Sequence, residues 1–427
     1  MLYTLCLVVG ASLVGFTNAL QENIEKHTTC SWSPFLREDQ LSCAAPKAKR
    51  QHETNVRDNT QKLEKNYDGL YQSPSDYKLP PFWKGPEKCF RKFCLFTNQD
   101  HGEGMSLITT GRIAYLAANS PIPSTPGLEP TAYYEAEVPG KGAGLFANRT
   151  IRKGEIIFQR HPVLAVQFTL HLDLDPQARE ELYQVAINRL PEATRARFVR
   201  QIGTTAYDKV EQNAFRLFLD GDHTHSSHLG LFPEVSKMNH DCRPNIHYRI
   251  ANLTHTTVAV RDTPPGDELT VSYIYGKTLH ADRQTQLRNY WGFNCTCSQC
   301  STLPTPKADA SDGRIRQIRA LENEIETLLT AQGTIKGGEG ARPEMNGALV
   351  GLYLAERLDA YLAPTYTRAA LLHSMFGDEE RARVFAAEAV AALEREVGLM
   401  AMDLESMRRL AGDPRGHWSW GIRVAAN

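Results

Sequence analysis

The sequence predicts an α+β protein, in which short strands, a helical insert and a metal-bound cysteine loop are followed by a helical region. Three observations lead to this prediction. Short β-rich segments bounded by turn residues fill the middle of the chain. A single cysteine and a later cluster of three have a spacing typical of a metal site. The last third repeats apolar residues every three or four positions, as amphipathic helices do.

Composition limits the function classes. The 427 residues, 41% of them apolar, suffice for about two or three domains with sizeable cores. The 48 basic and 49 acidic residues nearly cancel, so the overall charge favours neither nucleic acid nor an anionic membrane. The sequence therefore carries no direct nucleic-acid signal, and a charged partner would have to be met locally.

Residues 1–19 resemble a secretory signal peptide, because an apolar run over residues 5–16 ends at the small residues Thr17 and Ala19. The segment before the run lacks Lys and Arg, so a buried N-terminal helix or a misassigned start stays the alternative. The run is too short to span a bilayer, and no transmembrane segment is expected. Secretion would place the protein in the secretory pathway or outside the cell; the alternative is the nucleus or the cytoplasm.

Residues 20–130 are rich in Pro, Gly, Lys and polar residues, which predicts an irregular or extended N-terminal extension. Four of the nine cysteines lie in it. In an oxidising compartment these four would form two disulfides, and the sequence leaves three connectivities open. They are Cys30, Cys43, Cys89 and Cys94.

The next segment, residues 131–285, reads as a domain of short strands. Residues 144–150 and 155–159 flank a turn at residues 152–154, which predicts a hairpin. Asp175 followed by Pro176 predicts the start of a helical insert that runs to about residue 219. Further strands are predicted over residues 246–250, 256–261 and 268–273.

The C-terminal helical region is predicted over residues 312–411. Its first helix, over residues 313–330, carries an apolar stripe. Residues 366–375 and 379–397 predict two antiparallel helices that resemble one tetratricopeptide-like hairpin, although an ordinary helical bundle is equally open. This region is a candidate surface for a protein partner.

Four cysteines are the candidate metal ligands. Three thiols in one short segment cannot all pair with one another, so we expect them to bind one tetrahedral ion together with the distant fourth. Four thiolates are typical of a closed structural Zn²⁺ site, and disulfides are the alternative. In an oxidising compartment the metal would have to bind before oxidation. The four are Cys242, Cys295, Cys297 and Cys300.

Four segments, in their order as well as their residues, resemble a SET-domain protein-lysine methyltransferase with its cysteine-rich post-SET segment. They cover residues 138–147, 230–245, 268–273 and 291–300. The resemblance is greatest to the SET-and-MYND subgroup and its fungal relatives. The MYND finger is missing, because the insert contains no cysteine. The resemblance implies a SET domain over residues 131–285 and a zinc-bound post-SET segment over residues 286–301.

The resemblance also implies methyl transfer from S-adenosylmethionine to a lysine amine of a protein, with a histone tail as one possible substrate. It makes Tyr273 the catalytic candidate. Methyl transfer is an in-line displacement that requires a neutral, aligned amine in a dry channel, and a phenol hydroxyl can hold the amine in line. The implied cofactor-binding residues are Lys141, Gly142, Ala143, Asn239, His240, Trp291 and Phe293.

One departure from the family keeps a second reading open. Trp291 stands where the family often has tyrosine, so a catalytically silent SET module that acts as a protein-interaction scaffold is the alternative. A secreted, disulfide-linked interaction protein is a third possibility. Zinc would serve catalysis indirectly, by holding the flap of Trp291 and Phe293 over the site.

Two other patterns carry less information. Residues 213–215 match a family string that contacts the cofactor, although helix packing explains them as well. Three nearby histidines resemble a metal tract, but we expect them in a solvated loop. These are His223, His225 and His228.

Overall fold

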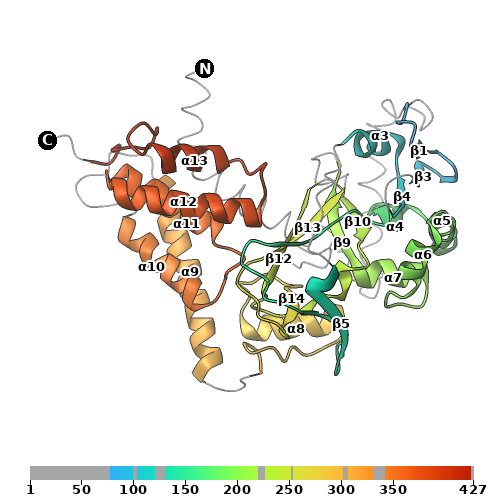
Figure 1. Ribbon diagram of the computed structural model, residues 1–427, viewed down its shortest axis with the longest axis horizontal. Helices are drawn as coiled ribbons and strands as arrows, with labels where there is room; N and C mark the ends of the chain where they lie inside the picture. The colour runs from blue at the N-terminus through green and yellow to red at the C-terminus, as the bar shows by residue number, and fades with distance from the viewer. Residues whose placement is uncertain are drawn as a thin grey trace, which may run out of the picture.

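The structure is a computed structural model that describes residues 77–99, 103–120, 130–219, 227–251, 253–301, 306–330 and 342–424. Three sheets of short strands gather on one side of the molecule and the C-terminal helices on the other (Figure 1). The predicted α+β class is therefore confirmed. The predicted signal segment, Cys30 and Cys43 lie outside the described residues.

The largest sheet has seven strands in the order β1-β3-β4-β8-β10-β9, with β2 paired to β3. The strands are β1 (Trp83–Lys84), β2 (Cys89–Phe90), β3 (Phe93–Asn98), β4 (Met105–Thr109), β8 (Leu164–Gln167), β9 (Ala214–Phe218) and β10 (Ser227–Leu231). Strand β4 pairs in parallel with β8, which joins residues far apart in the sequence.

The prediction of an irregular extension is wrong for the described part of residues 20–130. This part supplies β1 to β4 and the helix α3 (Gly111–Asn119). Every residue of β3 and of β4 is buried. A strand buried on both faces has no apolar–polar alternation, so two short runs inside a polar, Pro-rich region gave no strand signal.

A disulfide joins Cys89 to Cys94, which are paired opposite one another on β2 and β3. This is one of the pairings that the sequence left open. The other two cysteines of the extension are not described, so the second predicted disulfide stays a prediction.

The remaining strands form two smaller sheets. The four-stranded sheet has the order β11-β14-β6-β5 and the three-stranded sheet the order β12-β13-β7. They contain β5 (Tyr133–Val138), β6 (Gly142–Ala147), β7 (Ile156–Arg160), β11 (Asn239–His240), β12 (Ile246–Ala251), β13 (Thr254–Ala259) and β14 (Glu268–Val271). The three later strands predicted from the sequence are confirmed, with small differences at their ends.

The hairpin predicted around residues 152–154 is wrong, because β6 and β7 belong to different sheets. Polar contacts turn the chain from one sheet to the other. The Asp262 carboxylate accepts from the backbone N–H of Lys153 at 2.8 Å, and Glu155 accepts from that of Arg152 at 2.8 Å. Glu155 is a local partner, but Asp262 is distant in the sequence, so the length of the turn alone was misleading.

Asp175 caps a helix as predicted, since its carboxylate accepts from the backbone N–H groups of Gln177 and Ala178, each at 3.0 Å. The insert itself begins a few residues earlier, with a short helix that the sequence did not predict. It contains α4 (Leu170–Asp173), α5 (Pro176–Asn188), α6 (Glu192–Val199) and α7 (Ala206–Asn213). The predicted end at about residue 219 is wrong, because residues 214–218 form β9. A short apolar run gives no periodicity that separates a buried strand from a helix.

The C-terminal region consists of α9 (Pro306–Thr330), α10 (Pro343–Ala355), α11 (Ala363–Met375), α12 (Glu379–Glu396) and α13 (Leu404–Gly412). Helices α11 and α12 pack closely because four alanines of α12 are fully buried: Ala382, Ala386, Ala389 and Ala392. The helix pair is confirmed, while its likeness to a tetratricopeptide repeat stays a prediction. In the described part of the chain, no helix is both long and apolar enough to cross a membrane.

Candidate active site and metal centre

The centre of the candidate site is a parallel pairing between the short strands β11 and β14. Asn239 lies opposite Thr270, and His240 opposite Val271. Asn245 fixes this crossing, since its Oδ1 accepts from the Thr270 N–H at 2.8 Å and its Nδ2 donates to the Glu268 carbonyl at 2.9 Å. The segments over residues 230–245 and 268–273, which the family resemblance groups together, are therefore held side by side.

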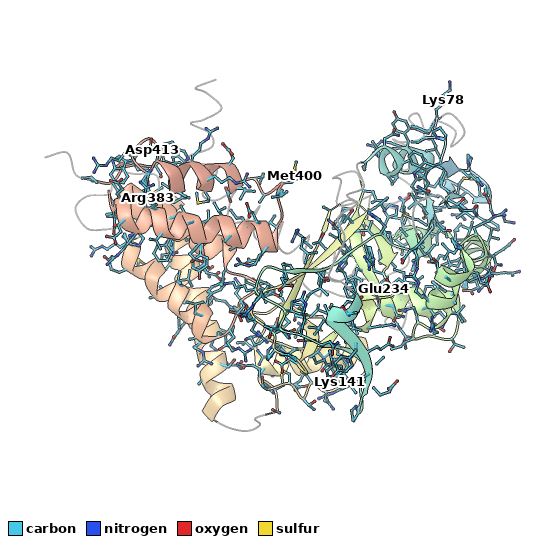
Figure 2. All side chains as sticks on the ribbon, in the orientation of Figure 1. Lys78, Lys141, Glu234, Arg383, Met400 and Asp413 are labelled. Carbon is cyan, nitrogen blue, oxygen red and sulfur yellow. A yellow bond between two sulfur atoms is a disulfide. The ribbon has the colours of Figure 1, made fainter. Side chains whose placement is uncertain are left out.

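Asn239 connects this crossing to the glycine-rich turn. Its Nδ2 donates to the carbonyl of Ala143 at 3.2 Å and to Glu268 Oε1 at 2.8 Å. The other oxygen of Glu268 lies 3.4 Å from the Lys141 ammonium, at the tip of the β5–β6 hairpin (Figure 2). Two predicted cofactor-binding residues, Lys141 and Asn239, thus meet at one carboxylate, and Asn239 connects a third, Ala143, to them. Sequence reasoning missed Glu268, because an acid at the start of a strand gives no signal of its own.

The glycines of the turn have two distinct roles. Gly140 and Gly142 have φ angles of +77° and +75°, which side chains rarely adopt, and a Cβ on either would meet no atom within 4 Å. Gly144 is instead packed tightly, since a Cβ there would lie 2.7 Å from Val138 Cγ2 and 2.9 Å from Glu268 Oε1. The backbone at Gly142 therefore borders open space, while Gly144 allows β6 to approach Glu268.

His240 links the strand end to the cysteine loop. Its Nδ1 accepts the backbone N–H of Tyr273 at 3.0 Å, and its Nε2 lies 3.3 Å from Cys242 Sγ. Burial lowers the pKa of His240 to about 3, so the ring is neutral. Because Nδ1 accepts, the proton is on Nε2, and this nitrogen donates to the sulfur.

Tyr273 lies among three aromatic rings. Its hydroxyl donates to the carbonyl of Met238 at 2.8 Å. Its ring centroid is 5.3 Å from that of His240, 5.5 Å from that of Trp291 and 6.5 Å from that of Phe293. The predicted catalytic residue and both predicted flap residues are therefore brought together, although they come from different elements.

The flap begins at the last residue of the helix α8 (His280–Trp291). Gly292, with φ +76°, ends this helix in the left-handed conformation and turns the chain back. Gln284 of α8 then holds both backbone groups of Cys295, each at 2.9 Å. The helix thus positions the first cysteine of the cluster and, with it, Phe293.

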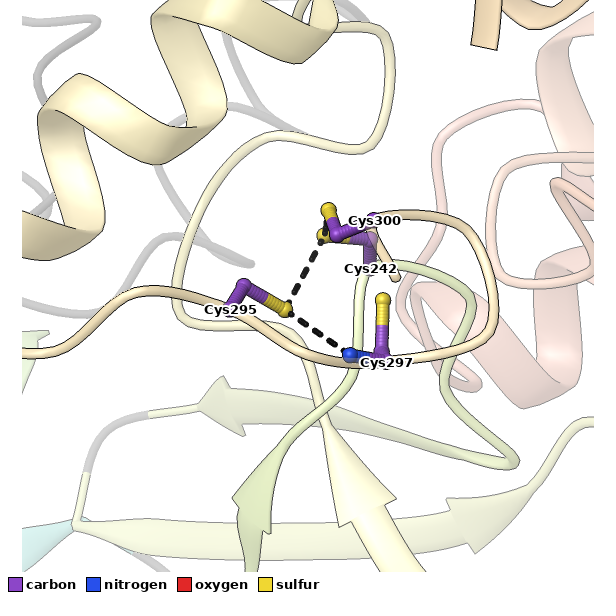
Figure 3. A group of neighbouring side chains, drawn as sticks. All are labelled: Cys242, Cys295, Cys297 and Cys300. Atoms are coloured by element: carbon purple, nitrogen blue, oxygen red, sulfur yellow. Dashed lines mark hydrogen bonds between the residues drawn. The ribbon is translucent and has the colours of Figure 1, made fainter. Parts of the chain in front are cut away.

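The four predicted metal ligands converge, and their sulfurs all lie within 4.8 Å of one another (Figure 3). The Cys242 sulfur is 3.5 Å from that of Cys300 and 3.9 Å from that of Cys295. Tetrahedral Zn²⁺ with Zn–S bonds of 2.3 Å requires sulfurs about 3.8 Å apart. All four side chains are buried free thiols. The donor chemistry and the spacing therefore fit a four-thiolate zinc site, and the disulfide alternative is not adopted.

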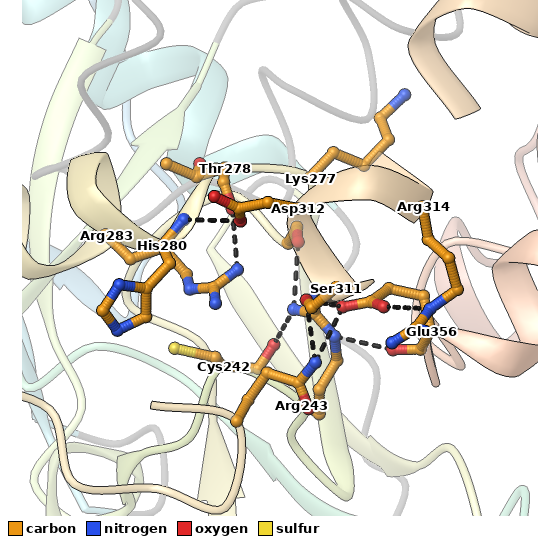
Figure 4. Close-up of polar contacts among 12 residues, drawn as sticks. Cys242, Arg243, Lys277, Thr278, His280, Arg283, Ser311, Asp312, Arg314 and Glu356 are labelled. Atoms are coloured by element: carbon orange, nitrogen blue, oxygen red, sulfur yellow. Dashed lines mark hydrogen bonds and ion pairs between the residues drawn. The ribbon is translucent and has the colours of Figure 1, made fainter. Parts of the chain in front are cut away.

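A buried polar network ties this loop to the C-terminal helices (Figure 4). Arg243, next to the ligand Cys242, forms an ion pair with Glu356 after α10 at 2.5 Å, with both side chains at 1% exposure or less. Glu356 also accepts from Gln299 of the cysteine loop at 2.9 Å and pairs with Arg314 of α9 at 2.7 Å. Sequence reasoning found neither Arg243 nor Glu356, because their distance in sequence hides the pairing.

Two weaker predictions have different outcomes. His228 is a buried residue of β10 whose Nε2 lies 2.9 Å from Thr109 Oγ1, so the solvated-loop prediction is wrong for it. His223 and His225 lie outside the described residues. In the string over residues 213–215, Phe215 packs edge-on against Tyr248 at 5.2 Å, and its predicted contact with the cofactor stays a prediction.

Comparison with known proteins defines the class. Residues 142–274 match the family model described as SET domain. This range contains the β11–β14 crossing and Tyr273. Residues 142–274 of this chain therefore contain a SET domain.

Its relatives include fungal and animal proteins. The chain is 28% identical over 298 residues to the Schizosaccharomyces pombe protein named histone-lysine N-methyltransferase set5, covering 68% of this chain and 86% of that protein. It is 30% identical over 173 residues to Homo sapiens N-lysine methyltransferase SMYD2, covering 38% of each chain. A Meyerozyma guilliermondii protein named histone-lysine N-methyltransferase SET5 is 34% identical over 101 residues, 21% of its length. The predicted similarity to the SET-and-MYND subgroup and its fungal relatives is confirmed.

Proposed function

We propose that this protein is an S-adenosylmethionine-dependent protein-lysine methyltransferase. The observation that carries the proposal is the β11–β14 crossing, which sets Tyr273 against Met238 and beside the rings of Trp291 and Phe293. The names of the relatives support the same activity. A histone is one candidate substrate, because the Schizosaccharomyces pombe relative is named for it.

The residues at the β5–β6 turn fit the cofactor. The open space at Gly142 leaves room for a ligand against the backbone. Both donors of the Asn239 amide are occupied by Ala143 and Glu268, so its Oδ1 is the atom that could receive an ammonium group. Lys141 and His240 complete the set carried over from the family. When bound, S-adenosylmethionine supplies the electrophilic methyl group.

Tyr273 would align the lysine amine. Its hydroxyl proton is committed to Met238, so the oxygen lone pairs are left to accept an N–H of the amine. Walls made by Trp291 and Phe293 would exclude water, and desolvation lowers the pKa of a lysine toward its neutral, nucleophilic form. The chain thus orients and desolvates the amine and needs no acid or metal in contact with it.

Zinc, held by Cys242, Cys295, Cys297 and Cys300, would supply structural stabilisation. It would fasten the loop that follows Phe293 onto the segment that follows His240. The flap and the crossing would then be fixed relative to one another. This role predicts that zinc removal lowers activity through Phe293 and Trp291 and does not act on the reacting atoms.

The test uses Tyr273→Phe in the full chain, with Tyr134→Phe as a matched control on an exposed part of β5. We expect cofactor binding by calorimetry to be retained. Methyl transfer to histones and to extract proteins should fall about 100-fold, as when one aligned transition-state contact is removed. The control should keep full activity. The proposal fails if Tyr273→Phe transfers methyl groups as fast as the wild type.

The catalytically silent scaffold is the second candidate, and Trp291 is the observation that favours it. If the wild type binds the cofactor but labels no protein, and Trp291→Tyr gains activity, the scaffold is the correct assignment. In that case the helices α9 to α13 would be the surface to examine for a protein partner.

We also propose a secretory location, in which the substrate would be another protein and not a histone. The disulfide between Cys89 and Cys94 supports it, because such bonds persist in oxidising compartments. Residues 1–19 fused to a reporter should direct it into the secretory pathway. Retention of the reporter in the cytoplasm or nucleus would favour the alternative.

A further inference from the structure

Arg283 is a buried cation that the proposed function does not yet use. It lies on α8 and has no exposed surface. Its Nη1 donates to the carbonyl of Thr278 at 2.8 Å. Its Nε and Nη2 have no nitrogen or oxygen acceptor among the described residues. A buried guanidinium with unpaired N–H groups costs several kcal/mol unless another partner is present.

The cysteine cluster is the neighbour that can supply this partner. Burial lowers the pKa of Arg283, but charge interactions with Cys242 and Cys300, a side-chain hydrogen bond with Cys300 and the nearby Asp312 carboxylate raise it overall. Figure 4 shows the guanidinium pointing toward the Cys242 side chain. Four thiolates around one Zn²⁺ leave a net charge of roughly −2 in a buried site, which is itself unfavourable without a compensating cation.

The other buried arginine beside the cluster cannot serve this role. Arg243 donates to the carbonyls of Cys242 and Gly276, and its charge is matched by Glu356. Among the described side chains, Arg283 therefore combines full burial, a permanent positive charge and unused donors that face the sulfurs.

We propose that Arg283 retains the metal by donating its Nε–H and Nη2–H groups to the zinc-bound sulfurs of Cys242 and Cys300. The inference deepens the proposed zinc site and rests on it. N–H···S hydrogen bonds and the positive charge would lower the electron density on the thiolates. The sulfurs would then be protonated or oxidised less readily, and the metal would leave more slowly.

The test measures zinc release and does not depend on methyl transfer. Full-length wild type, Arg283→Met and Arg283→Lys are loaded with Zn²⁺, and its transfer to a colorimetric chelator is followed. Arg288→Met is the matched control, because this exposed arginine of the same helix also contacts the loop, at Asn294 Oδ1 2.9 Å away, but no sulfur. We expect Arg283→Met to weaken zinc retention about 10- to 100-fold.

Arg283→Lys separates metal retention from a purely structural role. Lysine can still donate to the Thr278 carbonyl but lacks the forked second donors, so we expect an intermediate loss. This variant decides the outcome if Arg283→Met does not fold. Release from Arg283→Lys at the rate of the wild type and of Arg288→Met overturns the inference, and so does a wild type that binds no zinc. Loss of methyl transfer alone, with zinc retention as expected, contradicts only the proposed activity.

Discussion

Glu356 is the residue at which a single substitution should do the most to separate the helices from the cysteine loop. Its carboxylate is fully buried and receives Arg243, Arg314, Gln299 and Ser311. Glu356→Gln keeps the shape of the side chain but removes the negative charge, which leaves the buried guanidinium of Arg243 uncompensated.

The expected loss of folding stability in Glu356→Gln follows from the burial of the ion pair between Arg243 and Glu356. Removing one partner of a buried ion pair costs about 3–5 kcal/mol. Arg243 keeps three carbonyl acceptors, those of Cys242, Gly276 and Glu356 itself, so the lower end, about 3 kcal/mol, applies. Asp359→Asn is the matched control. It breaks the partly exposed contact with Arg261 at 3.4 Å between the same two regions, worth about 0–1 kcal/mol.

Urea unfolding measures the difference. With a denaturant dependence of about 3 kcal/mol per molar, Glu356→Gln should lower the midpoint by about 1 M, and Asp359→Asn by a third of that or less. The double variant Arg243→Met with Glu356→Leu should recover part of the loss, because the only partner of Glu356 left with an unpaired charge is Arg314, which is partly exposed to solvent. Equal midpoints for Glu356→Gln and Asp359→Asn would refute the reasoning.

Two further predictions concern the helices and the glycine turn. Burial raises the pKa of the Glu396 carboxyl from near 4.5 to about 7. The folded state therefore binds this proton more tightly than the unfolded chain does. The stability that the proton confers is lost as the pH rises from about 4.5 through about 7. Thermal unfolding across this range should therefore show a smaller decline with pH for Glu396→Gln than for the wild type; parallel curves would contradict the assignment. Gly144→Ala should cost about 1–3 kcal/mol because its Cβ overlaps Val138 Cγ2. Adding Val138→Ala should restore only part of the stability and none of the cofactor affinity, since the clash with Glu268 remains. Calorimetry with unchanged affinity in Gly144→Ala would place the cofactor elsewhere.

The sequence was sufficient to predict features whose residues lie close together along the chain or form a continuous motif. Three thiols in one segment limit the possible partners, and the convergence of all four sulfurs follows from that constraint. The helix N-cap at Asp175 could be predicted for the same reason, because its hydrogen bonds are formed within three residues. Tyr273 and Asn239 were identified through the resemblance to SET-domain methyltransferases, because hydrophobic periodicity does not reveal contacts between distant segments.

What the sequence could not predict depends on partners that are distant along the chain. Strands β3 and β4 are buried on both faces, so they lack the alternation that marks a strand at a surface. In the sequence, three charged residues of the site have no feature that distinguishes them from ordinary surface charges: Glu268, Arg283 and Glu356. Their roles appear only when the crossing of β11 and β14 and the packing of α10 bring amide, sulfur and guanidinium groups against them.

The contacts of Arg243 also determine how the helices relate to the active site. Its Nη1 holds the carbonyl of Cys242, and the sulfur of that same residue accepts from His240, whose other nitrogen holds the N–H of Tyr273. A continuous path of hydrogen bonds therefore runs from Glu356 to the candidate catalytic strand. If the helices were removed, Arg243 would lose the carboxylate of Glu356 that compensates its charge next to the predicted metal ligand Cys242. The helical region is thus a structural support of the candidate active site.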